Sequence, residues 1–125
     1  MAGAFGSLAP SRLLDTRTGV GAAQAAVGAH GIVHLQVTGR GGVPASGVSA
    51  VVLNVTVTAP SGAGFVTVYA DGTALPGASN LNFVPGQTVP NLVIAPVGAD
   101  GKVDLYNGSN GTVQLIADVD GYFRG

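Results

Sequence analysis

Short segments that alternate apolar and polar residues recur along this sequence, and turn-forming residue pairs separate them. Such alternation places apolar side chains on one face of an extended strand, so it predicts half-buried β-strands. Strands are expected over 32–37, 49–58, 64–69, 79–84, 91–97, 102–107 and 112–119. The turn pairs are Asp71-Gly72, Pro85-Gly86, Asp100-Gly101, Asn107-Gly108 and Asn110-Gly111. Short strands spaced this regularly indicate an all-β sandwich or barrel.

Helical patterns are nearly absent. The one Ala-rich stretch, 21–27, is short and bounded by glycines, so we interpret it as a loop, with a single helical turn as the alternative. Because strands do not alternate with helices, a parallel α/β sheet is excluded. A chain of 125 residues corresponds to one domain, 1–125, and is long enough to bury a core. The predicted fold is a single antiparallel β-sandwich, jelly-roll-like, with seven or eight strands.

Two strands carry residues that constrain their surroundings. The segment 91–97 is nearly all apolar, which predicts a central strand with Pro96 near its end or at a bulge. Asp118 lies inside the strand 112–119, where Asp is disfavoured, so it needs a partner such as an Arg. The following pair, Asp120-Gly121, is a turn signal.

Segments 52–72 and 91–108 share a layout of an apolar strand, a Pro, a Gly-containing turn and a G-x-V-x-x-Y unit. The two units start at Gly64 and Gly101. This similarity predicts two hairpins in equivalent places in the sandwich. It is weak support for a duplication, because hairpins resemble one another on physical grounds alone.

The composition excludes several classes of partner. Charged residues make up 9% of the chain, against about 25% in typical soluble domains. Five basic residues cannot form the positive stripe that nucleic acid requires, so no nucleic-acid partner is expected. No apolar run approaches the roughly 20 residues of a membrane span, so no membrane insertion is expected. Residues 1–10 lack the features of a signal peptide, and the chain is compatible with a domain cut from a longer protein.

Catalytic and cofactor sites are hard to assemble from these residues. There is no Cys and no Glu, and no G-x-S-x-G nucleophile elbow. Asp15-Thr16-Arg17 has Arg where an aspartic protease needs Gly. On a strand, His30 and His34 would lie about 13 Å apart, too far to share one metal ion. We therefore expect a non-enzymatic protein without a cofactor.

The N-terminal region carries an unusual concentration of charge for this chain. Arg12 and Arg17 flank Asp15, whose carboxylate can pair with either guanidinium. We expect a structural ion-pair network of Arg12, Asp15, Arg17 and Asp118 that joins the N-terminal segment to the last strand; a ligand site is the alternative. Leu13 and Leu14 are adjacent, so in an extended chain one should face inward and the other outward or toward a neighbour.

Five long motifs carry a family resemblance. They are RLLDTR (12–17), GVSAVVLNVTVT (47–58), SNLNF (79–83), GQTVPNLV (86–93) and LIADVDGYF (115–123). In this order the chain resembles a β-rich accessory domain, often tandem and C-terminal, of large secreted actinobacterial proteins. The resemblance implies a secreted, extracellular, non-catalytic module and implies no particular ligand.

The chain departs from this pattern at two positions. Many members of the family carry Cys near Asp71 and near Asp104, which implies a disulfide there; this chain has Asp at both. If the positions are neighbours, the carboxylates would repel, or one pKa would rise, or they would hold a cation. We favour two solvated turn carboxylates over a metal site, because hard cations usually need several more oxygen ligands.

The expected function is attachment of a larger protein to a cell-surface or extracellular polymer, such as a cell-envelope polysaccharide. Candidate ligand-binding residues are Tyr69, Tyr106, Asn80 and Asn82, since tyrosine rings can stack on sugars and amides can hydrogen-bond to them. The alternatives are packing for the tyrosines and a solvated face for the asparagines. The second candidate function is a self-associating structural subunit of a stalk, fibre or oligomer, because the β surface lacks the Lys and Glu residues that block edge pairing.

Overall fold

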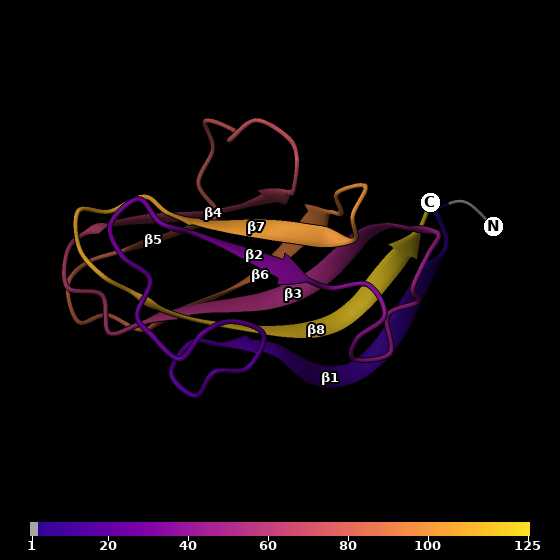
Figure 1. The fold of residues 1–125 in the computed structure, drawn as a ribbon, viewed down its shortest axis with the longest axis horizontal. Coiled ribbons are helices and arrows are strands. Elements are labelled where there is room, and N and C mark those ends of the chain that lie inside the picture. Colours follow the sequence, from indigo (N-terminus) through magenta and orange to yellow (C-terminus); the bar gives the residue numbers. More distant parts are fainter. Residues whose placement is uncertain (1–2) are drawn as a thin grey trace.

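The computed structural model describes residues 3–125 and arranges them in two antiparallel sheets of four strands each (Figure 1). The strands are β1 (Phe5–Asp15), β2 (Ile32–Gln36), β3 (Val48–Thr58), β4 (Gly64–Ala70), β5 (Leu81–Phe83), β6 (Val89–Pro96), β7 (Lys102–Asn107) and β8 (Gln114–Arg124). Residues 3–125 contain no helix, and so none that could span a membrane. The prediction of an all-β antiparallel sandwich is confirmed.

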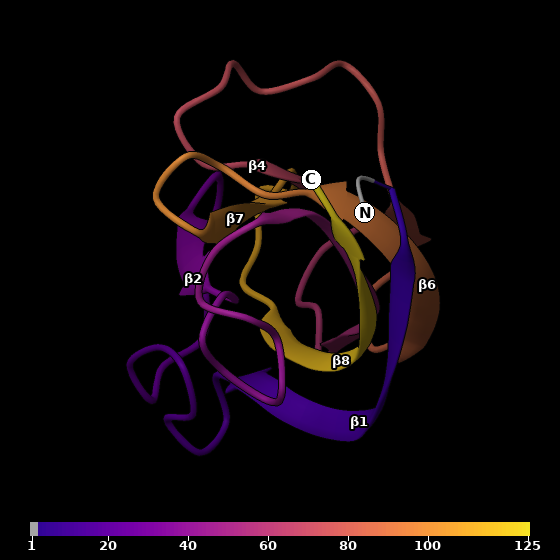
Figure 2. The same ribbon diagram turned by 90° about the vertical axis from the view of Figure 1, so that its right-hand side faces the viewer.

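The strand order is that of a jelly roll. One sheet has the order β1-β8-β3-β6 and the other has the order β2-β7-β4-β5. The pairs β1·β8, β2·β7, β3·β6 and β4·β5 are nested, as if one long antiparallel hairpin were wrapped around a core. The end view in Figure 2 shows the strands enclosing that core.

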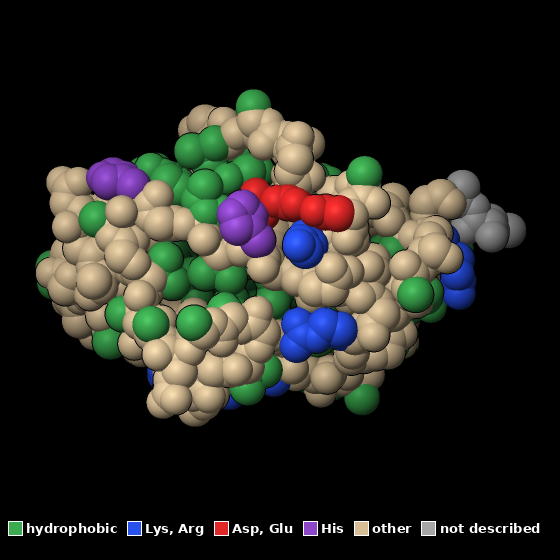
Figure 3. Space-filling view, in the orientation of Figure 1, with side chains coloured by type: hydrophobic (Ala, Val, Ile, Leu, Met, Phe, Trp, Pro, Cys, Tyr) green, Lys and Arg blue, Asp and Glu red, His purple; other side chains and the backbone are tan. Residues whose placement is uncertain are grey.

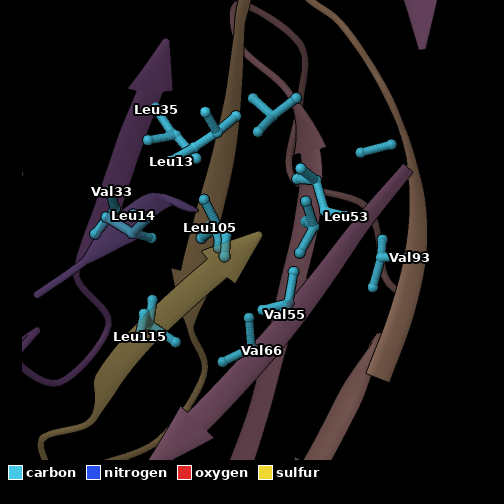
Figure 4. Close-up of a cluster of buried hydrophobic side chains, with 14 of the residues drawn as sticks. Leu13, Leu14, Val33, Leu35, Leu53, Val55, Val66, Val93, Leu105 and Leu115 are labelled. Carbon is cyan, nitrogen blue, oxygen red and sulfur yellow. The ribbon is translucent and has the colours of Figure 1, made fainter. Parts of the chain in front are cut away.

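Inward-facing side chains of both sheets meet between the layers (Figure 4). Leu53 and Val55 of β3 and Leu115 of β8 face Val66 of β4 and Leu105 of β7, and all five are fully buried. Burying each such side chain stabilises the fold by about 1.5–3 kcal/mol. The apolar half of each alternating segment therefore forms the core, and the polar half is left for the outer faces.

Strand β1 was not predicted from the sequence. Gly6, Pro10 and two charged residues obscure its alternation, and its pairing with β8 is irregular. One register shift falls between Arg12 and Leu14. Because of this irregularity Leu13 and Leu14 are both buried, so the expectation that one of them faces outward is wrong.

Strand β6 lies at the edge of its sheet, so the prediction of a central strand at 91–97 is wrong. Its apolar composition has another origin: Leu92 and Ile94 point outward and are 60% and 61% exposed, while Val93 and Ala95 enter the core. Pro96 is the last residue of β6, as expected.

The Asp120-Gly121 pair does not form a turn, because β8 continues through it to Arg124. Val52 pairs with Gly121 and Leu53 with Val119, which leaves Asp120 as the extra residue of a β-bulge. The stretch 21–27 forms a loop without a helical turn, as we had favoured.

The two similar segments are not hairpins. Each crosses from one sheet to the other, β3 to β4 and β6 to β7. Their equivalence is nevertheless visible in the pairing of β4 with β7, where Thr67 lies opposite Tyr106 and Tyr69 opposite Asp104. Thr67 and Asp104 are the fourth residues of the two G-x-V-x-x-Y units, and Tyr69 and Tyr106 are the sixth. Each fourth residue therefore pairs with the sixth residue of the other unit, so an approximate two-fold axis relates β4 and β7.

Candidate functional site

Three ionisable side chains meet on the outer face of the sheet β2-β7-β4-β5. His34 of β2 lies opposite Asp104 of β7, and its Nδ1 is 2.8 Å from Asp104 Oδ1. Asp71 directly follows β4, and its Oδ1 lies 3.0 Å from the same Nδ1. Figure 3 shows histidine and carboxylate side chains side by side on this face.

Strand alternation explains why these side chains point outward. Val33 and Leu35 enter the core on either side of His34, and Val103 and Leu105 do the same on either side of Asp104. The register between β2 and β7 then brings the imidazole and the carboxylate together. The Asp71 backbone N–H donates to the carbonyl of Lys102 on β7, at the end of β4 where the chain leaves the sheet.

The three groups shift one another's protonation. Hydrogen bonds to Asp104 and then to Asp71 raise the pKa of His34. Hydrogen bonds with Asp100, then with Asp104 and His34, lower the pKa of Asp71 to about 2. Burial, followed by the hydrogen bond with Asp71, raises the pKa of Asp104. Asp71 is thus the charged member of the carboxylate pair, and Asp104 is the member that more readily takes up a proton.

Asp71 and Asp104 are therefore neighbours, but they are not two solvated turn carboxylates. Asp104 lies in the middle of β7 and is 4% exposed. That His34 joins them could not be predicted, because strand alternation predicts which way a side chain points and not which strand lies beside it. His34 shares its site with Asp71 and Asp104 and not with His30, in keeping with the expected separation of the two histidines.

A half-buried apolar area occupies the other end of this face. Ile32 of β2 lies opposite Tyr106 of β7, and the Phe65 ring of β4 lies 6.1 Å from the Tyr106 ring. His30 Nδ1 is 2.9 Å from the Tyr106 hydroxyl, and His30 Nε2 is 3.0 Å from Asn110 Oδ1. Figure 3 shows hydrophobic side chains in the area between the two histidines.

Two of the four predicted ligand-binding residues have structural roles. Tyr69 is buried, and burial, followed by Asp104 and Asp71, raises the pKa of its phenol. Asn80 Oδ1 accepts a hydrogen bond from the backbone N–H of Val68. The Asn80 bond holds the end of the 71–80 connection against β4.

The other two predicted residues are accessible. Tyr106 is half-buried, and Asn82 is exposed on β5 directly opposite Phe65. The structure thus brings Tyr106 and Asn82 to either side of the Phe65 ring, and a ligand lying along this face would meet two aromatic rings and an amide.

The structure also brings together the four residues of the expected ion-pair network, Arg12, Asp15, Arg17 and Asp118. Asp15 accepts from Arg17 Nε and NH2, both at 3.0 Å, and from Arg12 NH1 at 3.2 Å. Arg12 Nε also donates to Asp118 Oδ1 at 2.9 Å. The Arg17 hydrogen bond is the largest influence that lowers the pKa of Asp15.

A separate open pocket of about 290 Å³ lies between two loop regions, 45–48 and 97–101, with Thr38 at its wall. Its only ionisable lining side chain is Asp100, among backbone groups and the small side chains of Ala45, Ser46 and Ala99. This lining offers hydrogen bonds to a small polar molecule and little apolar surface.

These features define the chain as an all-β jelly-roll sandwich with one polar and aromatic outer face. No protein-family model, curated protein or solved structure matched the chain when it was compared with them.

Proposed function

We propose that this chain is a non-enzymatic accessory module that attaches a larger secreted protein to an extracellular or cell-surface polymer. The observation that carries the proposal is the half-exposed area formed by Ile32, Phe65 and Tyr106 on one sheet face. Aromatic rings whose polar groups stay accessible suit polymers with apolar faces and hydroxyl edges, such as polysaccharides.

Flanking side chains add hydrogen bonds to this surface. His30 already orients the Tyr106 hydroxyl, and Asn82 presents an exposed amide opposite Phe65. The low charge of the chain, 9% of residues, also favours a neutral polymer over a charged partner.

Retention on insoluble polysaccharides and isolated cell walls tests this proposal. We expect the wild-type chain to be retained, and we expect Tyr106→Ala to weaken retention by roughly three- to tenfold, the scale of one aromatic contact. Phe5→Ala is the matched control, because Phe5 is an exposed aromatic on the other sheet. Absence of retention on every polymer, or an equal loss with Phe5→Ala, would contradict the proposal.

A second candidate function is self-association, and the edge strand β6 favours it. Leu92 and Ile94 project from its outer face, and β6 carries no Lys, Glu or Asp. Edges without such charges are prone to pair with other chains.

Light scattering after size exclusion tests this second function. Concentration-dependent dimers that Leu92→Lys abolishes and Tyr106→Ala leaves intact would support it. A monomer at high concentration would contradict it.

A further inference from the structure

Asp15 and Asp104 are the two most buried carboxylates in residues 3–125, and their surroundings differ. Asp15 is 2% exposed and accepts four hydrogen bonds, three from guanidinium groups and one from the backbone of Arg17. Within residues 3–125 the Asp104 carboxylate meets the Asp71 carboxyl group and only one nitrogen donor, His34 Nδ1. That atom carries a single proton and is shared with Asp71.

The positive charge around Asp104 is also insufficient. Asp71 and Asp104 together carry two negative charges when ionised, and one imidazolium balances only one of them. Lys102 lies on the same face of β7, yet its ammonium forms no ion pair among residues 3–125. A buried carboxylate beside a second carboxylate needs either a shared proton or a cation.

We propose that His34, Asp71 and Asp104 bind a divalent transition-metal ion of the zinc type. Their donor atoms, one imidazole nitrogen and two carboxylate oxygens, all lie within 4.8 Å of one another. This inference is independent of polymer attachment, since the Tyr106 area lies at the other end of the face.

The donor set selects the metal. Ca²⁺ and Mg²⁺ prefer oxygen ligands throughout, whereas imidazole nitrogen with carboxylate oxygen suits Zn²⁺ and its neighbours in the first transition row. Zinc bonds of about 2.0–2.2 Å would separate ligand atoms by roughly 3.3–3.5 Å around a tetrahedron. The distances of 2.8 and 3.0 Å from Nδ1 need to widen by only about 0.5 Å to reach that geometry.

The elements that carry the ligands permit this adjustment. His34 lies on β2, an edge strand, and its side chain is 56% exposed. Asp71 lies at the end of β4, and Asp104 is fixed in the middle of β7. Three protein ligands on an open face leave the remaining coordination position to water or to an oxygen of a bound molecule.

The test uses the whole chain after treatment with a chelator. Calorimetry with Zn²⁺ should give one site per chain, and Co²⁺ should give a visible absorption band at the same stoichiometry. His34→Ala and Asp71→Asn change accessible side chains and should weaken the affinity for Zn²⁺ and Co²⁺ by more than about tenfold. Loss of a residue that only hydrogen-bonds to a metal ligand already weakens metal affinity by about that factor. His30→Ala is the matched control, because His30 is the other exposed histidine, and it should leave binding unchanged.

Thermal unfolding supplies a readout that does not depend on a ligand assay. Zn²⁺ should raise the melting temperature of the wild type and of His30→Ala, and should leave that of His34→Ala unchanged. The proposal is overturned by binding weaker than about 1 mM, by an equal loss in His30→Ala, or by tighter binding of Ca²⁺ than of Zn²⁺.

Discussion

Arg12 and Asp118 lie directly opposite each other on β1 and β8, and Arg12 Nε donates to Asp118 Oδ1 over 2.9 Å. The same guanidinium also donates to Asp15, which accepts two further hydrogen bonds from the Arg17 guanidinium. The first strand is thereby joined to the last through charges that are 106 residues apart. Both arginine side chains remain partly exposed, and every carboxylate of the cluster is paired, which is the arrangement of a structural network.

Asp15→Asn should lower the free energy of unfolding by roughly 1.5–3 kcal/mol, the range for hydrogen bonds to charged groups. The carboxylate is buried, so its replacement by a neutral amide weakens bonds that water does not restore. Urea denaturation measures the change. Asp120→Asn is the control, because Asp120 has no ion pair in residues 3–125, and it should shift stability by less than about 0.5 kcal/mol.

The same variant distinguishes a structural network from a ligand site. A lower melting temperature with unchanged polymer retention fits the network. An unchanged melting temperature with lost retention would show that Asp15 belongs to a binding site.

The Arg12–Asp118 pair should contribute less than Asp15 does. Its members are half and one-quarter exposed, so solvent and salt screen the pair, and a double-mutant cycle of Arg12→Ala and Asp118→Ala should give about 0.2–1 kcal/mol of coupling. The coupling should shrink as salt is raised. A coupling above about 2 kcal/mol that is insensitive to salt would mean that the pair is effectively buried.

Stability should fall in acid partly through Asp15. Its pKa is lowered in the folded protein, chiefly by the hydrogen bond from Arg17, so its contribution is present above the ordinary value of 3.8. That contribution is lost as the pH falls from 3.8 through the lowered pKa. Unfolding free energies of wild type and Asp15→Asn should therefore differ most above about pH 5 and draw together as the pH falls below 3.8 through the lowered pKa. A constant difference across this range would contradict the assignment.

Most of the fold could be predicted from local patterns, because the alternation of apolar and polar residues in a strand indicates which of its faces is buried. Six of the seven predicted strands begin and end within two residues of the observed ones. The seventh, 112–119, begins within two residues of β8 but ends five residues before it. Strand β1 and the edge position of β6 could not be predicted. In β1 the irregular register interrupts the alternation of apolar and polar residues. In β6 the exposed Leu92 and Ile94 make the segment as apolar as a strand buried on both faces.

Of the two charged clusters, one could be predicted from the sequence and the other could not. The pairing of Asp118 with an Arg was predictable, because a charge inside a strand needs a partner. The association of His34 with Asp71 and Asp104 was not, since it depends on which strands become neighbours across 37 and 70 residues of chain. The matching positions of the two tyrosines in their G-x-V-x-x-Y units also do not predict their exposure, because Tyr69 is buried and Tyr106 is half-buried.

Two Asp-Gly turns, Asp71-Gly72 and Asp100-Gly101, provide a matched test of how closely the chain packs at the end of β2 and the start of β7. Gly72 and Gly101 have nearly the same left-handed conformation, with φ of +82° and +79°, so alanine at either position bears a similar backbone cost of about 1–2 kcal/mol. A Cβ at Gly72 would meet no atom within 4 Å, whereas a Cβ at Gly101 would collide with Thr38 Oγ1 and approach Gln36 Nε2. Gly101→Ala should therefore destabilise the chain by at least about 1 kcal/mol more than Gly72→Ala, since it also displaces the Gln36 side chain from its bonds to Thr38 and Gly101. Denaturation midpoints with unchanged m-values would measure the difference, and equal midpoints would show that the β2–β7 end is loosely packed.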